Sequence, residues 1–210
     1  SDLAAVRAEL GQFPVLVDIL PQAAKFWQRF HILEPSKLVA KAYRQTQLLE
    51  TDNWAFLMGK FWDNFGFDNT SYNSVNNKRH IALLKQKLCD NYIDNWSAYI
   101  NRANQDGSSN GFKLCTFRLF KQQFIMENYQ LGTTCAVRRD FTKLRISAHT
   151  LQIELGRNSI SKIPADRRYC KICNPKVVED EMHFMLYCQG NEKPRKVLKD
   201  KLLNFTNFHN

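Results

Sequence analysis

The sequence predicts an all-α fold, and three observations lead to this prediction. Apolar residues recur three or four positions apart through most of the first 130 residues, which is the spacing of an amphipathic helix. No stretch alternates apolar and polar residues in the manner of a β-strand, and no internal repeat emerges. With only 8 glycines and 6 prolines in 210 residues, the composition also argues against a loop-rich or all-β chain.

Turn-forming residues divide this periodic pattern into separate helices. Pro21 predicts a kink or two shorter helices within the first of them, and Gly156 is expected to close the last as a C-cap. A loop rich in Asn, Gly and Ser at 104–111 gives the clearest break. The expected helices span residues 15–33, 37–49, 54–65, 75–103, 114–131 and 135–155.

The predicted architecture is a multi-helix body with a small zinc-stapled CCHC knuckle near the C-terminus. Aromatic residues at helical spacing are core residues far more often than base-stacking platforms, so Trp27, Trp54, Trp62 and Trp96 are assigned to the core. The expected division is a helical body at 1–135, a basic helix and loop at 136–165, the knuckle at 166–190, and a basic C-terminal helix or tail at 191–210.

Positive charge is concentrated in the second part of the chain. The formal net charge is +10, and residues 136–210 hold 15 lysines and arginines against 8 acidic residues, compared with 15 against 12 before them. Such an excess suits a polyanionic partner such as RNA or DNA, although a solvated basic surface is the simpler interpretation. Because the excess surrounds the cysteine cluster, nucleic acid is the favoured partner.

The compartment predicted from the sequence is intracellular and reducing. No run of about 18 apolar residues could span a membrane, so no membrane partner is expected. The first residues do not form a signal peptide, and their opening directly into a helical pattern is typical of a segment taken from a longer protein. Cys89, Cys115 and Cys135 stand singly among apolar or helix-forming neighbours and are expected to be buried free thiols.

The candidate metal ligands lie in one short segment with the spacing C-x2-C-x9-H-x4-C, and they are Cys170, Cys173, His183 and Cys188. Three thiolates and one imidazole are a standard ligand set for one structural zinc ion, and no position remains open for a water. If the second half is helical, His183 and Cys188 lie about a turn and a half apart, with some unwinding near Cys188. The alternative is a redox-active C-x-x-C pair, which requires a βαβ context that the sequence lacks.

Enzyme motifs are missing from the sequence. It has no phosphate-binding glycine loop, no H-E-x-x-H motif and no paired aspartates of polymerase type. The chain is therefore predicted to be an accessory domain rather than a complete enzyme, with no small-molecule substrate.

Several motifs occur in an order that resembles a known family. They are KLRISAH at 143–149, IELGR at 153–157, IP at 163–164, RYC-x-x-C at 168–173 and EDE-x-HF-x-x-x-C at 179–188. This region resembles the C-terminal part of reverse transcriptases from LINE-type (non-LTR) retrotransposons of animals. ELG-x-x-P at 9–14 and KFW-x-R at 25–29 look like the helical segment after the polymerase thumb of the same proteins.

The resemblance implies a domain that binds template RNA or target DNA beside the upstream reverse transcriptase domains of one protein during target-primed reverse transcription. The resemblance also implies that the protein acts in the nucleus and passes through a cytoplasmic ribonucleoprotein stage. In relatives with a C-terminal endonuclease the nuclease follows the knuckle, whereas here 22 residues follow Cys188.

Basic residues around the knuckle are the expected nucleic-acid contacts. The competing interpretation is structural, with Arg145 paired to Glu154 and His149 bonded to a loop carbonyl. The candidate contacts are Arg138, Arg145, His149, Arg157, Arg167, Arg168, Lys171, Lys193, Arg195 and Lys196.

The alternative function is a helical protein-interaction or architectural domain, domesticated from such an element, whose zinc is purely structural.

Overall fold

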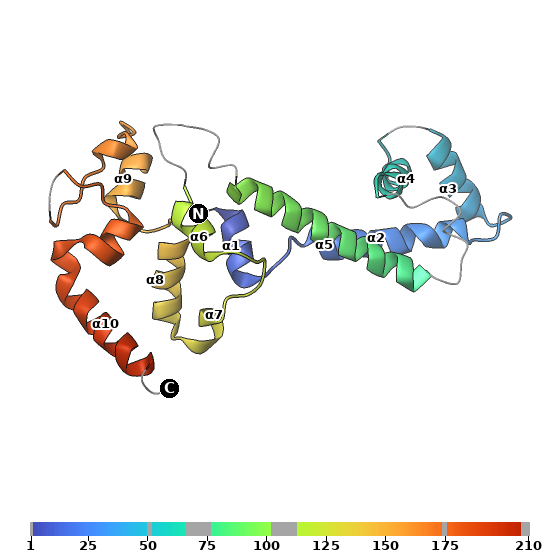
Figure 1. The fold of residues 1–210 in the computed structure, drawn as a ribbon. Coiled ribbons are helices and arrows are strands. Elements are labelled where there is room, and N and C mark those ends of the chain that lie inside the picture. Colours follow the sequence, from blue (N-terminus) through green and yellow to red (C-terminus); the bar gives the residue numbers. More distant parts are fainter. Residues whose placement is uncertain (1, 50–51, 66–76, 102–112, 174–175, 207–210) are drawn as a thin grey trace. The chain divides into compact units, whose positions relative to one another are not determined.

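The structure is a computed structural model that describes residues 2–49, 52–65, 77–101, 113–173 and 176–206 (Figure 1). These residues form helices and no strand, which confirms the predicted all-α class. Their one stretch of extended pairing is an isolated antiparallel bridge between Tyr169 and Val178. The predicted loop at 104–111 lies outside the described residues.

The chain folds as two compact units. The inner unit is Phe13–Trp96, and the split unit joins Ser1–Gln12 to Ser97–Asn210. This division does not coincide with the boundary predicted after residue 135. The expected helical body at 1–135 is shared between the two units, because α1 (Leu3–Leu10) finds its partners beyond residue 120.

The inner unit has one aromatic core. Trp27 and Trp62 are fully buried with their ring centroids 5.9 Å apart, and Tyr43, Met58 and Leu84 belong to the same cluster. The ring of Trp54 is near Phe26 but the residue is 41% exposed, so its assignment to the core was wrong. The helices that contribute are α2 (Leu16–His31), α3 (Leu38–Leu48), α4 (Trp54–Asn64) and the first part of α5 (Asn77–Asn101). A single helix runs through Pro21 rather than two.

In the split unit two predicted helices are interrupted. The expected helix at 114–131 stops at Phe120, as α6 (Cys115–Phe120). It ends there because the buried side chain of Lys121 donates to groups that follow it in the chain, the Ile125 carbonyl and the Glu127 carboxylate. Helix resumes as α7 (Tyr129–Gly132). The expected helix at 135–155 is divided into α8 (Cys135–Arg145) and α9 (Gln152–Asn158), so Gly156 lies inside a helix and is not a C-cap.

Buried charges connect α1 to the later helices of the split unit. The Glu9 carboxylate is fully buried and accepts hydrogen bonds from Arg145 Nε at 2.8 Å and from the Tyr129 hydroxyl at 2.6 Å. The second ion-pair partner of Arg145 is Glu127, at 3.4 Å. Because a buried charge is tolerated only with such partners, this network fixes residues 2–12 against α8.

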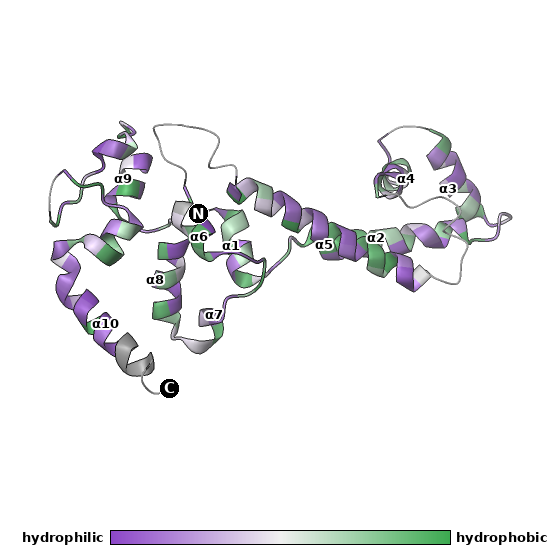
Figure 2. Ribbon diagram, viewed as in Figure 1, coloured by the Kyte–Doolittle hydropathy of each residue, from purple (hydrophilic) through white to green (hydrophobic). Residues whose placement is uncertain are grey.

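The end of the described chain is α10 (Glu192–Thr206), which agrees with the helical alternative for 191–210. Figure 2 shows hydrophilic residues along much of it. No helix among the described residues has both the length and the apolar character needed to cross a bilayer. Of the lone cysteines, Cys89 is half-buried and Cys135 is exposed, which corrects the expectation of burial for Cys135.

Candidate metal centre

The predicted ligands Cys170, Cys173, His183 and Cys188 come together in the split unit. Their sulfur and nitrogen atoms all lie within 4.8 Å of one another. The Sγ atoms of Cys170 and Cys188 are 3.9 Å apart, and Cys173 Sγ is 3.1 Å from His183 Nε2. A tetrahedral metal with metal–sulfur bonds of about 2.3 Å separates two sulfurs by about 3.8 Å. The cluster therefore has the size and donor set to hold one metal ion.

A short two-stranded ribbon positions the first pair of cysteines. Cys170 N–H donates to the Val177 carbonyl at 2.7 Å, and Glu179 N–H donates to the Arg168 carbonyl at 2.9 Å. The Cys170 thiol also accepts the Ile172 N–H at 3.4 Å, as expected of a tight turn between two ligands. This pairing brings residues 177–179 back beside residues 168–170, just before the segment that carries the second pair of ligands.

A π-helical turn, His183–Tyr187, positions the second pair. Cys188 N–H donates to the His183 carbonyl at 2.7 Å, an i→i+5 bond that is wider than an α-turn. The wider turn brings the fifth residue back toward the first, so both ligands face one point. Cys188 itself is extended, in line with the unwinding expected there.

Three successive acidic residues fasten the ligand segment. Asp180 accepts the backbone N–H of His183 at 2.7 Å rather than its ring N–H, and Glu179 accepts Gln152 N–H at 2.8 Å. The Glu181 carboxylate accepts from Ser147 Oγ at 3.0 Å and lies 2.8 Å from His149 Nε2. The sequence signal for this role is the acidic run at 179–181 inside a basic region, from which a carboxylate was expected to accept the ring N–H of His183 rather than these backbone and side-chain groups.

Burial governs the chemistry of the ligands. Cys170, Cys188 and His183 are 2%, 1% and 7% exposed. Burial raises the pKa of the Cys170 thiol to about 11, although the backbone N–H groups of Ile172 and Cys173 lower it. A thiol with so high a pKa is a poor nucleophile at neutral pH and ionises when a metal binds it. This argues against a redox role for Cys170, whereas the convergence of four donor atoms is what indicates metal binding.

Four of the predicted nucleic-acid contacts are exposed side chains near these ligands. Arg167 and Lys171 flank Cys170 within the knuckle, and Lys193 and Lys196 lie on α10. Arg195, half-buried on the same helix, donates from Nη2 to the Cys188 carbonyl at 3.0 Å. It thus supports a ligand from outside the cluster, a role that sequence spacing did not reveal.

Three other predicted contacts have structural partners. Arg168 is 2% exposed and donates to the carbonyls of Ile163 and Ile153, each at 2.8 Å. Arg145 is buried and paired with Glu9 rather than Glu154. His149 accepts the Leu151 N–H at Nδ1, so its Nε2–H is the donor to Glu181. For these three the geometry favours the structural alternative.

The two remaining candidates are half-buried and also engaged. Arg138 donates to the Gln130 carbonyl at 2.7 Å, and Arg157 lies 3.1 Å from the Glu154 carboxylate. The ten candidates do not form one continuous cluster of exposed cations. Of these ten candidates, the four named above are the ones whose side chains are exposed.

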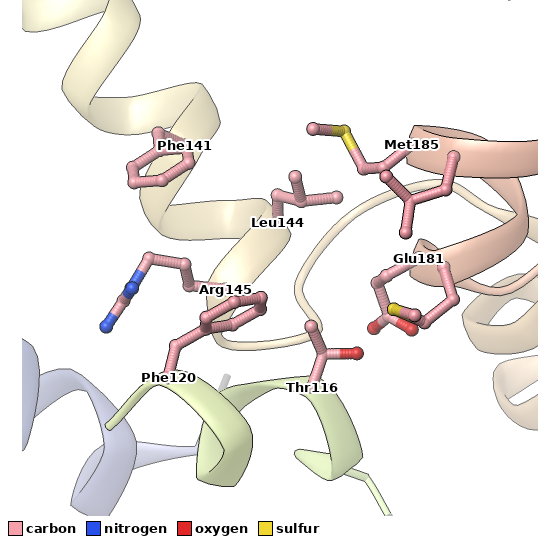
Figure 3. A pocket seen from close by; sticks show the side chains of 9 residues that line it. Thr116, Phe120, Phe141, Leu144, Arg145, Glu181 and Met185 are labelled. Atoms are coloured by element: carbon pink, nitrogen blue, oxygen red, sulfur yellow. The ribbon is translucent and has the colours of Figure 1, made fainter. Parts of the chain in front are cut away.

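An apolar pocket lies between α6, α8 and the segment that carries His183 (Figure 3). Its volume is about 180 Å³. Figure 3 shows Phe120, Leu144 and Met185 around it, and the carboxylate of Glu181 at its edge is the one bonded to Ser147 and His149. The pocket therefore adjoins the support of the metal centre without including a ligand.

The arrangement as a whole is a closed set of four donors, held by hydrogen bonds to neighbouring backbone and carboxylates, with exposed cations at its margin. A closed donor set stabilises a fold and leaves no position where a metal-bound water could act on a substrate.

The chain was compared with protein-family models, with curated proteins and with solved structures, and no match was found in any of the three.

Proposed function

We propose that residues 166–190 form a zinc knuckle in which Cys170, Cys173, His183 and Cys188 hold one zinc ion per chain. Three thiolates and one imidazole are a common donor set of structural zinc sites, and the 3.9 Å sulfur separation suits their tetrahedral geometry. The metal would join the Arg168–Cys170 ribbon to the π-helical turn. Its contribution is folding free energy rather than catalysis.

Metal analysis tests this assignment. Protein purified without chelator is expected to contain one equivalent of zinc, and Cys173→Ser is expected to lose most of it. Cys135→Ser is the matched control, because Cys135 is an exposed cysteine outside the cluster. Less than half an equivalent in the unmutated protein would contradict the proposal.

We further propose that the knuckle and its basic margin bind RNA or DNA. The observation that carries this proposal is the pair Arg167 and Lys171, both exposed on the knuckle itself beside buried ligands. Lys193 and Lys196 add two exposed cations on the helix that follows. Exposed lysine and arginine side chains contact phosphates, and these contacts supply affinity without sequence information.

The order of the motifs between residues 143 and 188 supports a more specific proposal. In it, the chain is the C-terminal region of a LINE-type retrotransposon reverse transcriptase. It would act in the nucleus as an accessory domain, holding template RNA or target DNA for polymerase domains elsewhere in the same protein. Catalysis would belong to those domains.

Salt-dependent binding tests the nucleic-acid proposal. Replacing Arg167 and Lys171 together with Ala is expected to weaken binding to all RNAs and DNAs by similar factors. The slope of log affinity against log salt should become shallower by about 1 to 2 units, since each lost phosphate contact accounts for about 0.7 to 0.9. The control is Lys41→Ala with Arg44→Ala, an equal charge change at exposed positions of α3 in the inner unit.

The second candidate function is a protein-interaction or architectural domain with a purely structural metal. The apolar pocket between α6, α8 and the ligand segment favours it, because such pockets accept apolar side chains of a partner. An Arg167/Lys171 variant with unchanged affinity and unchanged salt slope would favour this alternative.

A further inference from the structure

A second apolar pocket, of about 150 Å³, lies between the π-helical turn His183–Tyr187 and α10. It adjoins the apolar pocket described above, because Met185 lines both of them. The two pockets therefore form one groove, which we call the Met185 groove. Its apolar lining includes Phe120, Phe141 and Leu144 in the first pocket, and Phe184, Pro194 and Leu198 in the second.

The apolar lining of the groove is open to solvent and is assembled from separate elements. Phe120 at the end of α6 is 58% exposed, Met185 in the π-helical turn is 37% exposed, and Leu198 on α10 is 48% exposed. Figure 3 shows that Phe120 and Met185 reach the first pocket from different elements. A single exposed apolar residue is ordinary on a protein surface, whereas a contiguous apolar patch marks a site of interaction.

The volumes of the two pockets indicate what kind of ligand fits. At about 180 and 150 Å³, each is smaller than the roughly 300–1,000 Å³ of sites that hold drug-sized molecules or cofactors. Each pocket is instead suited to one apolar side chain of a partner. On an amphipathic helix, residues three or four positions apart lie about 5–6 Å apart on one face. Two small pockets separated by a single side chain match that spacing.

The charges along the groove favour an acidic side chain at the second pocket. Arg195 lines this pocket; its Nη2 donates to the Cys188 carbonyl, and its Nη1 is buried with no hydrogen-bond acceptor among the described residues. A buried guanidinium nitrogen without an acceptor is costly, so an incoming carboxylate is stabilised there. α10 also carries five lysines and arginines against two acidic residues. At the first pocket, the Glu181 carboxylate is already occupied by Ser147 and His149.

We propose that the Met185 groove binds an amphipathic helix of a partner protein. The helix places one apolar side chain in each pocket and a carboxylate against Arg195. Its two apolar residues are three or four positions apart, and its acidic residue lies on the same face beside the second of them. The proposal rests on the protein-interaction candidate function, to which it adds the chemistry of the partner, and it is independent of nucleic-acid binding.

The first test selects binders for the full chain, loaded with zinc, from a display library of short helical peptides with randomised exposed positions. The enriched peptides are expected to share two large apolar residues three or four positions apart and an acidic residue on the same face. Replacing either apolar residue with Ser should weaken binding about 10- to 30-fold, as for an interface anchor. If no peptide is enriched, the groove and the protein-interaction candidate both fail, while the metal and nucleic-acid proposals stand.

Serine variants of the protein locate the binding site. Phe120→Ser and Leu198→Ser should each weaken binding of a selected peptide by about 10- to 30-fold. Their matched controls are Leu119→Ser and Val197→Ser, because these neighbours are 59% and 55% exposed on the same helices but line neither pocket. Zinc content should be unchanged in all four variants, which separates a lost contact from a lost fold. Peptides that bind the groove variants and the control variants equally would overturn the groove while leaving a protein-interaction function in place.

A double-mutant cycle tests the carboxylate, and sedimentation tests the identity of the occupant. Replacing the acidic residue of a selected peptide with its amide should weaken binding to the parent protein about tenfold but have little effect on binding to Arg195→Gln. Equal effects on the two proteins would overturn the contact with Arg195. The protein alone is expected to sediment as a monomer. Self-association that is abolished by Phe120→Ser would assign the groove to a second copy of this chain and overturn the proposal.

Discussion

At the scale of single residues, several buried polar side chains of the split unit are matched to particular partners. Glu9 accepts from Arg145 and Tyr129, and Lys121 donates to Glu127 and to a carbonyl. Each of these groups would be costly to bury alone, because its hydration is lost on folding. The contribution of Tyr129 depends on the protonation of its hydroxyl, which makes it accessible to a pH experiment.

The free energy of unfolding at alkaline pH is expected to depend on Tyr129. Burial and the hydrogen bond to Glu9 raise the pKa of Tyr129 to about 12, outweighing Thr142 and Arg145, which lower it. A pKa raised in the folded state contributes stability that is complete below the ordinary value of 10.0 and is lost as the pH rises through about 12. The free energy of unfolding, measured by denaturant titration between these pH values, should therefore decline less in Tyr129→Phe than in the parent protein.

Phenolate absorbance gives an independent check on the same residue. The difference between parent and Tyr129→Phe should show one phenol that titrates above the ordinary range. Tyr99, whose hydroxyl is bonded to Asp2, also has its pKa raised to about 12 and remains in both proteins. Identical pH dependence of the two proteins would contradict the role assigned to Tyr129.

At the scale of structural elements, the knuckle is closed by a contact between its two halves. Gly190, in the turn Gln189–Asn191 after the last ligand, packs on Ile172, which lies between the first two ligands. A Cβ at residue 190 would lie 2.1 Å from Ile172 Cγ2 and 3.7 Å from Cys188 Sγ. The two halves can approach this closely only with glycine at that position.

Gly190→Ala is expected to weaken metal binding without removing any ligand. Because Ile172 is β-branched, its Cγ2 cannot swing away as a long side chain would, and the turn that carries Cys170 and Cys173 must shift. Competition with a chromophoric chelator should show a lower metal affinity, and adding Ile172→Ala should restore much of it. Gly59→Ala in α4 is the control, since a Cβ there meets nothing within 4 Å. Unchanged metal affinity in Gly190→Ala would refute the contact.

Elements defined by local spacing were predictable, and those defined by distant partners were not. The four candidate ligands lie close together in sequence, so the chemistry of Cys and His at that spacing was sufficient. Arg145 was misleading because its partner Glu9 lies 136 positions away. The helix expected at 114–131 was wrong because apolar periodicity continues across Lys121, and nothing in that periodicity reveals a buried lysine that bonds its own following turn.

At the scale of the whole molecule, the metal centre and the tryptophans belong to different units. Trp27, Trp54, Trp62 and Trp96 all lie in Phe13–Trp96, whereas the four ligands lie in the split unit. Tryptophan emission therefore reports the inner unit, while helical circular dichroism reports both.

Removal of the metal is expected to separate these two signals. A strong chelator should reduce helical ellipticity, as the knuckle and the start of α10 lose their support, while tryptophan emission stays near its original wavelength. Returning zinc should restore the ellipticity. A red shift of the emission on chelation, in step with the loss of ellipticity, would show that the inner unit depends on the metal and would contradict this expectation.

The discontinuity of the split unit also has a consequence for biosynthesis. A ribosome adds about 5–20 residues per second, so Arg145 emerges about 7 to 27 s after Glu9, its partner 136 positions earlier. During that interval the complete inner unit, Phe13–Trp96, can already fold. The segment around Glu9 must remain exposed on the nascent chain until α8 has left the exit tunnel. The segment around Glu9 is thus translated before the inner unit, yet it reaches its native contacts only after the whole inner unit has been made.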